Sequence, residues 1–354
     1  MVAPTMLPTI SVVIPTYNGE AWIADALDSV FRQSHRPNEV IVVDDASSDG
    51  TAQQVTTLAI DAPVPVHLIR RETNSDSPAP TLNTGITRAT GELIAVLDQD
   101  DVFLPTKLEL QARALSGDPG LSFVFSLFRR HNNYGALWDL TAAHSRVRHF
   151  RRCMSSCNGF LRCEGPVALE AITRSPTNFF GGFPGFMFRR SAWERKGGLD
   201  ESLVIGADFE FLCWLCTQGA VGLIPEIHYQ RHEHGANLSR STGIRGHLDV
   251  IKVLLRYADY AGAPETPRVF RNAIQHHLWD IARRLASGGH RQAARYVSAT
   301  VSEMVGVSWQ VPVQRLAIPA YVGYYRVIGR PWKITADQAD EAVELAKTAA
   351  GLLA

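Results

Sequence analysis

Three aspartates follow an apolar run in the segment "IAVLDQDDVFLP", residues 94–105. The carboxylates of Asp98, Asp100 and Asp101 are close enough in the chain to repel one another and to raise one another's pKa, unless a cation or firm hydrogen bonds neutralise them. Carboxylate oxygens are preferred ligands of Mg²⁺ and Mn²⁺, which also bridge diphosphate oxygens. The spacing therefore indicates a divalent-cation site. The alternative is a solvated turn that caps a helix beginning at Leu104.

The elements around these aspartates alternate between strand and helix. Apolar and β-branched runs predict strands at 9–15, 39–45, 64–70 and 92–98, and apolar periodicity with capping residues predicts helices at 20–33, 51–58 and 81–91. Near-continuous apolar strands joined by helices predict a parallel sheet with helices on both faces. In such sheets ligands bind beyond the carboxyl ends of the strands. We therefore expect "PTYNG", Asp44 with Asp45, and the aspartate cluster to meet at one edge.

The composition and the missing motifs narrow the class of protein. The chain has 354 residues, 45% of them hydrophobic, and its 35 basic residues balance 35 acidic ones, so no overall field favours nucleic acid. A Gly-x-Gly-x-x-Gly after the first strand and a Gly-Lys-Ser/Thr loop are both missing, which disfavours dinucleotide oxidoreductases and P-loop nucleotidases. The N-terminus lacks the pattern of a signal peptide, and no stretch approaches about 20 uncharged apolar residues. These features predict a cytoplasmic protein without a spanning helix.

The five cysteines give little functional signal. Cys213 and Cys216 lie in "CWLC", within an apolar segment that predicts a buried helix, where free cysteine behaves as a small hydrophobe. The others, Cys153, Cys157 and Cys163, are irregularly spaced, which disfavours a zinc site, and a cytosolic location disfavours disulfides.

Longer segments resemble the family-two glycosyltransferases, which have a GT-A fold: residues 11–51, "NTGITRATGELIAVLDQDD", "FRRSAWERKGGLDE" and "GADFEFL". The resemblance runs from about Ile10 to Ser239. Such enzymes move a sugar from a nucleoside-diphosphate donor to an acceptor hydroxyl, with inversion at the anomeric carbon. The resemblance implies an α/β fold with a Rossmann-like, mostly parallel sheet and helices on both faces. The implied domains are a catalytic domain at 1–239, with a nucleotide-binding half at 9–118 and an acceptor-binding half at 119–239, and a helical C-terminal region at 240–354.

The same resemblance assigns the donor site. The residues that would contact the nucleotide sugar are Pro15, Thr16, Tyr17, Asp45, Asn83, Gly85 and Asp98. Tyr17 would stack on the base, with a turn residue packed on the sheet as the alternative. Asp45 would hydrogen-bond the base, whereas Asp44 would hold the loop that contains Ser47 and Ser48.

The cation, Mn²⁺ or Mg²⁺, would be bound by Asp100, with Asp98 on the ribose. Asp101 would orient its neighbours or cap the next helix. In "YQRHEHGANLS", one histidine would complete the metal shell or contact the diphosphate, and the spacing to Asn237 and Ser239 favours His234 over His232.

Inversion requires a base that takes the proton of the acceptor hydroxyl. Asp208 matches the catalytic base of the family and stands at the start of an apolar helix, where a simple capping role is the alternative. Glu210 is expected to support the site or to be solvated. Three positions depart from the family pattern: Leu82 and Trp214, where relatives often carry a basic residue, and Ala207, where they often carry an acidic one.

The acceptor is less defined by the sequence. Six arginines lie in a segment with few acidic residues that could neutralise them: Arg129, Arg130, Arg146, Arg148, Arg151 and Arg152. They indicate either a solvated face or a site for an anionic acceptor, such as a lipid-linked phosphate or a charged glycan. A tail with Arg315, Arg326 and Arg330 indicates a helix packed on the catalytic domain, with peripheral contact at the inner face of the membrane as the alternative.

The expected function is a metal-dependent glycosyltransferase of the hexosyltransferase type in surface polysaccharide or glycoconjugate assembly, with a UDP-sugar favoured as donor and a glycan or lipid-linked acceptor. The alternatives are a sugar-phosphate nucleotidyltransferase and a catalytically degenerate sugar-nucleotide binding module.

Overall fold

The computed structural model describes residues 7–132, 137–138, 154–173, 182–234, 244–257, 260, 266–305 and 334–353. The chain divides into two compact units, residues 1–235 and 236–354. None of the described helices combines the length and the apolar composition that a bilayer crossing requires.

The strands described in the first unit form one mixed sheet in the order β3-β2-β1-β4-β10-β6-β11-β9-β8, with β5 on β11 and β7 on β6. Their bounds are β1 Ile10–Thr16, β2 Glu39–Asp44, β3 Val66–Arg70, β4 Leu93–Val96, β5 Val102–Phe103, β6 Leu121–Asn132, β7 Leu137–Trp138, β8 Ser155–Cys157, β9 Phe160–Cys163, β10 Phe186–Arg189 and β11 Ala220–Glu233. β1 pairs in parallel with β2 and β4, and β2 with β3, which confirms the predicted parallel half. β10 is antiparallel to both β4 and β6, so the sheet as a whole is mixed.

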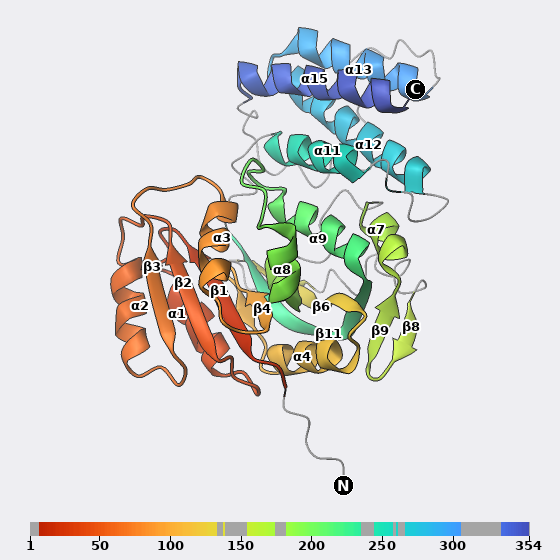
Figure 1. The fold of residues 1–354 in the computed structure, drawn as a ribbon. Helices are drawn as coiled ribbons and strands as arrows, with labels where there is room; N and C mark the ends of the chain where they lie inside the picture. Colours follow the sequence, from red (N-terminus) through yellow and green to blue (C-terminus); the bar gives the residue numbers. More distant parts are fainter. Residues whose placement is uncertain are drawn as a thin grey trace. The chain divides into compact units, whose positions relative to one another are not determined.

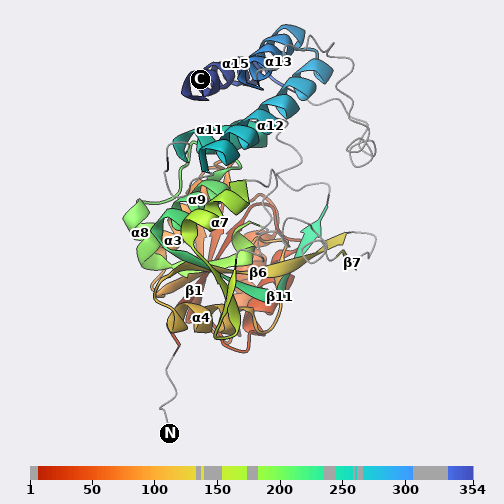
Figure 2. The same cartoon turned by 90° about the vertical axis from the view of Figure 1, so that its right-hand side faces the viewer.

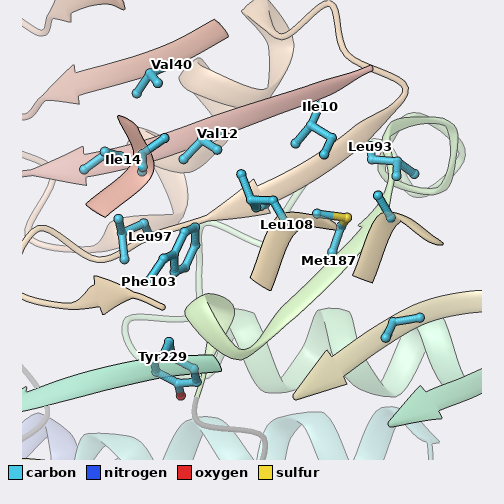
Figure 3. Close-up of a cluster of buried hydrophobic side chains, with 14 of the residues drawn as sticks. Ile10, Val12, Ile14, Val40, Leu93, Leu97, Phe103, Leu108, Met187 and Tyr229 are labelled. Atoms are coloured by element: carbon cyan, nitrogen blue, oxygen red, sulfur yellow. The ribbon is translucent and has the colours of Figure 1, made fainter. Parts of the chain in front are cut away.

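The helices of this unit are α1 Ile23–Phe31, α2 Thr51–Ile60, α3 Pro78–Arg88, α4 Lys107–Gly117, α7 Gly165–Thr173, α8 Arg190–Lys196 and α9 Ala207–Gln218, with a short 3₁₀ helix, η1, at Phe183–Gly185. Figure 1 shows α1, α2 and α4 beside the sheet, and one hydrophobic core joins these helices to it. Figure 3 shows part of this core, where Val12 and Ile14 of β1 lie near Leu97 and Phe103. α3 and α9 cover the opposite face, because Gly85 abuts Val13 and the ring of Phe211 packs 4.9 Å from that of Phe188.

β11 runs beside β6 over the length of both strands (Figure 2). The parallel ladder between them is interrupted between Ile224 and Tyr229, where the four residues 225–228 of β11 lie opposite Leu127 alone. This bulge shifts the register before β11 reaches its end.

The helix that the alternative reading of the aspartate turn placed at Leu104 begins later. Residues 102–103 form β5, which pairs with β11, and α4 begins at Lys107 after Thr106. The helix predicted at 81–91 begins earlier, because Ser77 caps it and Pro78 occupies its first turn.

The second unit is helical, as predicted. It consists of α11 Arg245–Tyr257, α12 Thr266–Ser287, α13 Arg291–Val305 and α15 Ala336–Leu353 (Figure 1). Arg245 of α11 forms an ion pair with Glu341 of α15 at 2.9 Å. Inside the unit, Nδ1 of His247 lies 2.9 Å from Nδ1 of His277, and burial lowers the pKa of both imidazoles.

Candidate active site

The aspartate cluster lies in the loop that follows β4, at the carboxyl edge of the parallel strands. The backbone N–H of Asp101 donates to the carbonyl oxygen of Asp98 at 3.0 Å, which closes the turn. Asp101 is only 2% exposed, and its Oδ1 accepts from the backbone N–H of His232 at 3.1 Å. The alternative of a solvated, helix-capping turn is therefore wrong for this carboxylate.

The carboxylates carry unfavourable charge that other groups must balance. Burial and the charge of Asp100 raise the pKa of Asp98 to about 7, and Asp208 adds to this effect, while Arg231 opposes it. Burial, Asp98 and Asp100 likewise raise the pKa of Asp101. Burial disfavours the guanidinium of Arg231, but the surrounding carboxylates still raise its pKa. The positive charge of Arg231, at the end of β11, thus offsets the negative charge of the three aspartates. Residue type and spacing did not indicate this role.

His234 completes this edge of the site. Its Nε2 lies 2.8 Å from Oδ2 of Asp100, whereas Nδ1 of His232 lies 2.7 Å from the backbone oxygen of the same residue. The preference for His234 over His232 thus agrees with the contact that His234 makes with the Asp100 side chain. The imidazole of His234 also stacks on the indole of Trp22, with ring centroids 4.4 Å apart and 12° between the planes. Trp22 lies in the segment 20–33 that apolar periodicity predicts as a helix, and that pattern does not indicate its contact with His234.

The chemistry of Asp100 and His234 fits a divalent cation. Two adjacent ligands of an octahedral cation are separated by about 3 Å, close to the 2.8 Å between Oδ2 and Nε2. Both side chains remain partly accessible, at 16% and 10% exposure. Among the residues that the structure describes, no group of three or more His, Cys, Asp and Glu could hold an ion. Within the described residues, Asp100 and His234 are therefore the two side chains that would hold such an ion.

Asp208 lies in the first turn of α9, as predicted. Its Oδ1 accepts from the backbone N–H of Phe209 at 2.6 Å, and a Cβ at Gly182 would lie 3.4 Å from its Oδ2. Because the charge of Asp208 raises the pKa of Asp98, the two carboxylates lie within electrostatic range although distant segments supply them. The candidate base and the cation loop thus belong to one site.

Glu210 does not face solvent and pairs with a lysine. It is 5% exposed, and its Oε2 lies 2.8 Å from Nζ of Lys196 in α8. This ion pair joins α8 to α9, so Glu210 holds the helix that carries Asp208.

β1 ends at the site with Pro15, Thr16 and Tyr17. Pro15 pairs with Val43 of β2, Thr16 is buried, and Tyr17 exposes 47% of its surface. The backbone of Tyr17 is held by Gln99, the residue between Asp98 and Asp100: Gln99 Oε1 accepts from Tyr17 N at 2.8 Å, and Gln99 Nε2 donates to Tyr17 O at 3.1 Å. Residue type gave no signal for Gln99, because a glutamine in this position has no chemistry of its own.

Asp45 lies beside this strand end, but its oxygens are engaged within the protein. Oδ2 accepts from the backbone N–H and the hydroxyl of Ser75, at 2.9 and 2.7 Å, and Oδ1 lies 2.8 Å from Nε of Arg71. Arg71, with its side chain 25% exposed, is therefore the more accessible partner of this ion pair, since Asp45 is only 5% exposed.

Asp44 holds the following loop, as expected. Its Oδ1 accepts from Ser47 N at 2.9 Å, and its Oδ2 pairs with Arg70 at 2.9 Å. Ser48 N donates instead to Oδ1 of Asn18, at 2.9 Å.

Asn83 and Gly85 have packing contacts that the sequence did not indicate. The amide of Asn83 binds the backbone N–H and carbonyl of Leu199, at 2.8 and 3.0 Å, and thus holds the loop after α8. A Cβ at Gly85 would lie 2.5 Å from Cγ1 of Val13 and 3.0 Å from Cγ2 of Val43. Gly85 therefore lets α3 approach the sheet, and a donor contact for either residue stays a prediction.

The positions that depart from the family pattern are packed in the interior or on aromatic rings. Leu82 and Ala207 are 1% and 2% exposed, and Trp214 stacks on Phe211 at 5.9 Å. Cys213 and Cys216 are buried in α9, and burial raises the pKa of both thiols.

The described residues include part of the predicted acceptor region. Arg129 of β6 donates to Gln230 of β11 at 3.2 Å. Arg130, the next residue of β6, pairs with Arg231 of β11. The following named positions lie outside the described residues: Arg146, Arg148, Arg151, Arg152, Cys153, Asn237, Ser239, Arg315, Arg326 and Arg330.

Together, the sheet, its helical layers and the carboxylates at its edge define the GT-A fold of the nucleotide-sugar transferases. Residues 11–195, more than half of the chain, match the model of glycosyl transferase family 2. The chain belongs to this family.

Two solved structures share the fold. The mannosyltransferase PcManGT from Pyrobaculum calidifontis, in complex with GDP-Man and Mn²⁺, has a TM-score of 0.58 at 20% identity and covers 97% of this chain and 87% of its own. S. aureus TarS 1–349, in complex with UDP-GlcNAc, has a TM-score of 0.54 at 18% identity, with coverages of 85% and 93%.

Among curated relatives, the putative teichuronic acid biosynthesis glycosyltransferase TuaG of Bacillus subtilis is 40% identical over 105 residues, which are 29% of this chain and 40% of TuaG. The matched part spans 62% of the length of another curated glycosyltransferase and 19% of a third.

Proposed function

We propose that the protein is an inverting, metal-dependent glycosyltransferase that moves a sugar from a nucleoside-diphosphate sugar to an acceptor hydroxyl. One observation carries the proposal. Asp100 in the loop after β4 contacts His234 beyond the end of β11 at 2.8 Å, and Asp208 at the start of α9 lies near enough to Asp98 to raise its pKa. A nucleoside diphosphate, a cation and an acceptor require these charges in one place.

Each residue has a task in this proposal. Asp100 and His234 hold the Mn²⁺ or Mg²⁺, which when bound stabilises the negative charge of the departing diphosphate. Asp98 contacts the ribose, and Tyr17 stacks on the base. Asp208 accepts the proton of the acceptor hydroxyl as that oxygen attacks the anomeric carbon from the side opposite the diphosphate.

The names of similar proteins support the chemical class of the substrates. TuaG carries a name from teichuronic acid biosynthesis, so we propose that this protein acts in the assembly of a cell-surface polysaccharide or glycoconjugate. PcManGT and TarS are in complex with GDP-Man and UDP-GlcNAc, respectively, so both a UDP-sugar and a GDP-sugar are candidate donors. An anionic glycan or lipid-linked acceptor, a cytoplasmic location and contact with the inner face of the membrane stay predictions from the sequence.

Family membership favours this reading over a nucleotidyltransferase. A catalytically degenerate binding module would bind the donor without transferring the sugar. An experiment that measures both donor binding and sugar transfer therefore distinguishes it from a transferase.

The experiment compares two substitutions. Asp208→Asn keeps the shape and polarity of the side chain but removes the negative charge that makes the carboxylate a base. The rate of sugar transfer should therefore fall by about 10²–10⁴-fold, while nucleotide affinity stays unchanged. Asp100→Ala removes a cation ligand, so it should abolish the Mn²⁺-dependent part of UDP or GDP binding. Isothermal titration with and without Mn²⁺, and sugar release from a panel of donors, provide the measurements.

Asp200→Asn is a matched control, because Asp200 also accepts a local backbone N–H, from Ser202 at 2.9 Å. It should retain transfer. If Asp208 only caps α9, asparagine would replace it almost without cost, since Asn and Asp cap helices comparably. Near-wild-type transfer by Asp208→Asn would therefore end the assignment of the base.

A further inference from the structure

Gln99 connects the cation loop to the end of β1. Its Oε1 accepts from the backbone N–H of Tyr17 at 2.8 Å and from the hydroxyl of Thr16, and its Nε2 donates to the carbonyl oxygen of Tyr17 at 3.1 Å. A carboxamide is suited to this contact, because it combines an acceptor and two N–H donors in one planar group. Both backbone polar groups of Tyr17 are thereby fixed by one side chain.

The surrounding backbone is shaped for this contact. A Cβ at Gly19 would lie 2.3 Å from Oε1 of Gln99 and 2.7 Å from Oγ1 of Thr16, so a side chain at position 19 would displace the amide. Asn18 adopts a positive φ of 47°, and its N–H donates to the hydroxyl of Ser47 at 2.8 Å. The turn that follows Tyr17 is thus held on the Ser47 side while Gln99 holds Tyr17 itself.

The phenol ring of Tyr17 is not packed away, since the residue exposes 47% of its surface. An exposed aromatic ring on a backbone with several fixed hydrogen bonds loses little conformational freedom when a ligand stacks on it. The neighbours of Gln99 on either side are Asp98 and Asp100, so the ring and the cation ligands are tied to the same loop.

We infer that Gln99 is a positioning residue, which holds Tyr17 for stacking on the donor base and couples the base site to the cation site. This inference rests on the proposed function. It assigns a role to Gln99, the residue between Asp98 and Asp100. This residue acts through its hydrogen bonds to Thr16 and Tyr17 and not through contact with the reacting atoms.

The test measures UDP and GDP affinity by isothermal titration, with and without Mn²⁺, in the full chain. Gln99→Ala should weaken binding of the nucleotide that the wild type prefers by about 10-fold, since two to three hydrogen bonds that orient Tyr17 are lost. Tyr17→Ala should weaken it by at least as much, and the double variant should show no further loss, because both changes remove the same stacking contact. Donor KM should rise while kcat changes less than about twofold, as expected for lost binding energy that is uniform along the reaction.

Gly19→Ala is an independent perturbation. It leaves Gln99 in the sequence but displaces its amide, so its loss of affinity should match that of Gln99→Ala. Gln111→Ala is the control for general destabilisation: Gln111 is a buried glutamine in α4 that donates to the carbonyl of Gly185 at 3.0 Å. It should lower the unfolding midpoint and leave nucleotide affinity unchanged.

The outcomes separate the inference from the function on which it rests. A wild-type protein that binds neither UDP nor GDP, with or without Mn²⁺, overturns the proposed function. A wild-type protein that binds one of them while Gln99→Ala binds it equally well, or while the losses from Gln99→Ala and Tyr17→Ala simply add, overturns the positioning role alone.

Discussion

Alanine at position 85 distinguishes a packing role of this glycine from a ligand-binding role. The added Cβ would lie 2.5 Å from Cγ1 of Val13 and 3.0 Å from Cγ2 of Val43. Both valines lie in parallel strands inside the sheet, and β-branched side chains are stiff at χ1, so neither can move aside freely. Overpacking of this kind costs about 1–3 kcal/mol. Because the Cβ would approach Val13 to 2.5 Å, the cost lies in the upper part of this range, about 2–3 kcal/mol. Alanine recovers up to about 1 kcal/mol of helix propensity, so the expected net loss of unfolding free energy is about 1–2 kcal/mol.

Urea and thermal unfolding measure this loss. For a unit of this size, a loss of 1–2 kcal/mol lowers Tm by roughly 2–8 °C. Gly117→Ala is the matched control, because Gly117 also lies in a helix but a Cβ there would meet nothing within 4 Å. The control should be as stable as the wild type or more stable by up to about 1 kcal/mol. Nucleotide affinity should be unchanged in both. A Gly85→Ala protein that unfolds like the wild type but binds UDP or GDP more weakly would refute the packing argument and return Gly85 to the donor site.

Three further predictions concern charged and buried groups. Burial lowers the pKa of Lys107 from 10.5 to about 7, so its charge destabilises the folded state fully below pH 7 and not at all above about pH 10.5. Lys107→Met should therefore raise the free energy of unfolding at pH 7 by roughly 1–4 kcal/mol, and by less as the pH rises. A variant that is less stable than the wild type at pH 7 would contradict this. Burial lowers the pKa of His277 to about 3 and also lowers that of its neighbour His247, so as the pH falls from 6.5 to 4 the unfolded chain takes up protons that the folded chain does not. Each of the two imidazoles should then lower stability by about 1.4 kcal/mol per pH unit. In urea unfolding, His277→Gln should reduce this slope by about 1.4 kcal/mol per pH unit, the share of one imidazole, whereas His276→Gln, at a side chain 49% exposed, should leave it unchanged; equal slopes in the two variants would exclude the assignment. Arg71→Met removes the N–H donors beside Asp45, the residue expected at the base, so the affinity for the nucleoside diphosphate that the wild type prefers should fall about 10-fold in titrations; an unchanged affinity would exclude a role of Arg71 in binding the base.

The parallel half of the fold could be predicted because its strands are buried on both faces and read as continuous apolar runs. The strand at 102–103 could not, since β5 exists through its pairing of Phe103 with Tyr229, far along the chain. The same applies to Trp22. Helical periodicity includes it in the helix predicted at 20–33, whereas in the structure it precedes α1 and stacks on His234, the residue that follows β11.

The residues of the candidate site also fall into those that the sequence could predict and those that it could not. The carboxylates could be identified because cation and proton chemistry requires those residue types at that spacing. The residues that hold them have no chemical signature of their own: Gln99 acts through backbone contacts, and the neutralising role of Arg231 requires the folded positions of three aspartates. The pairing of Asp45 with Arg71 also depends on the register of β2 and β3.

The bulge in β11 limits how the length of this chain can vary. Paired residues of neighbouring strands face the same side of a sheet, so Gly222 shares a face with Val124, and Tyr229 shares that face with Phe128. An even-numbered and an odd-numbered residue of β11 therefore lie on one side, because the bulge adds an odd number of residues between them. Removing one residue between Ile224 and Tyr229 would move Arg231 to the opposite face and away from the aspartates. Insertions in exposed turns can accumulate during divergence without such an effect, but in this short segment only changes by two residues keep the side-chain alternation.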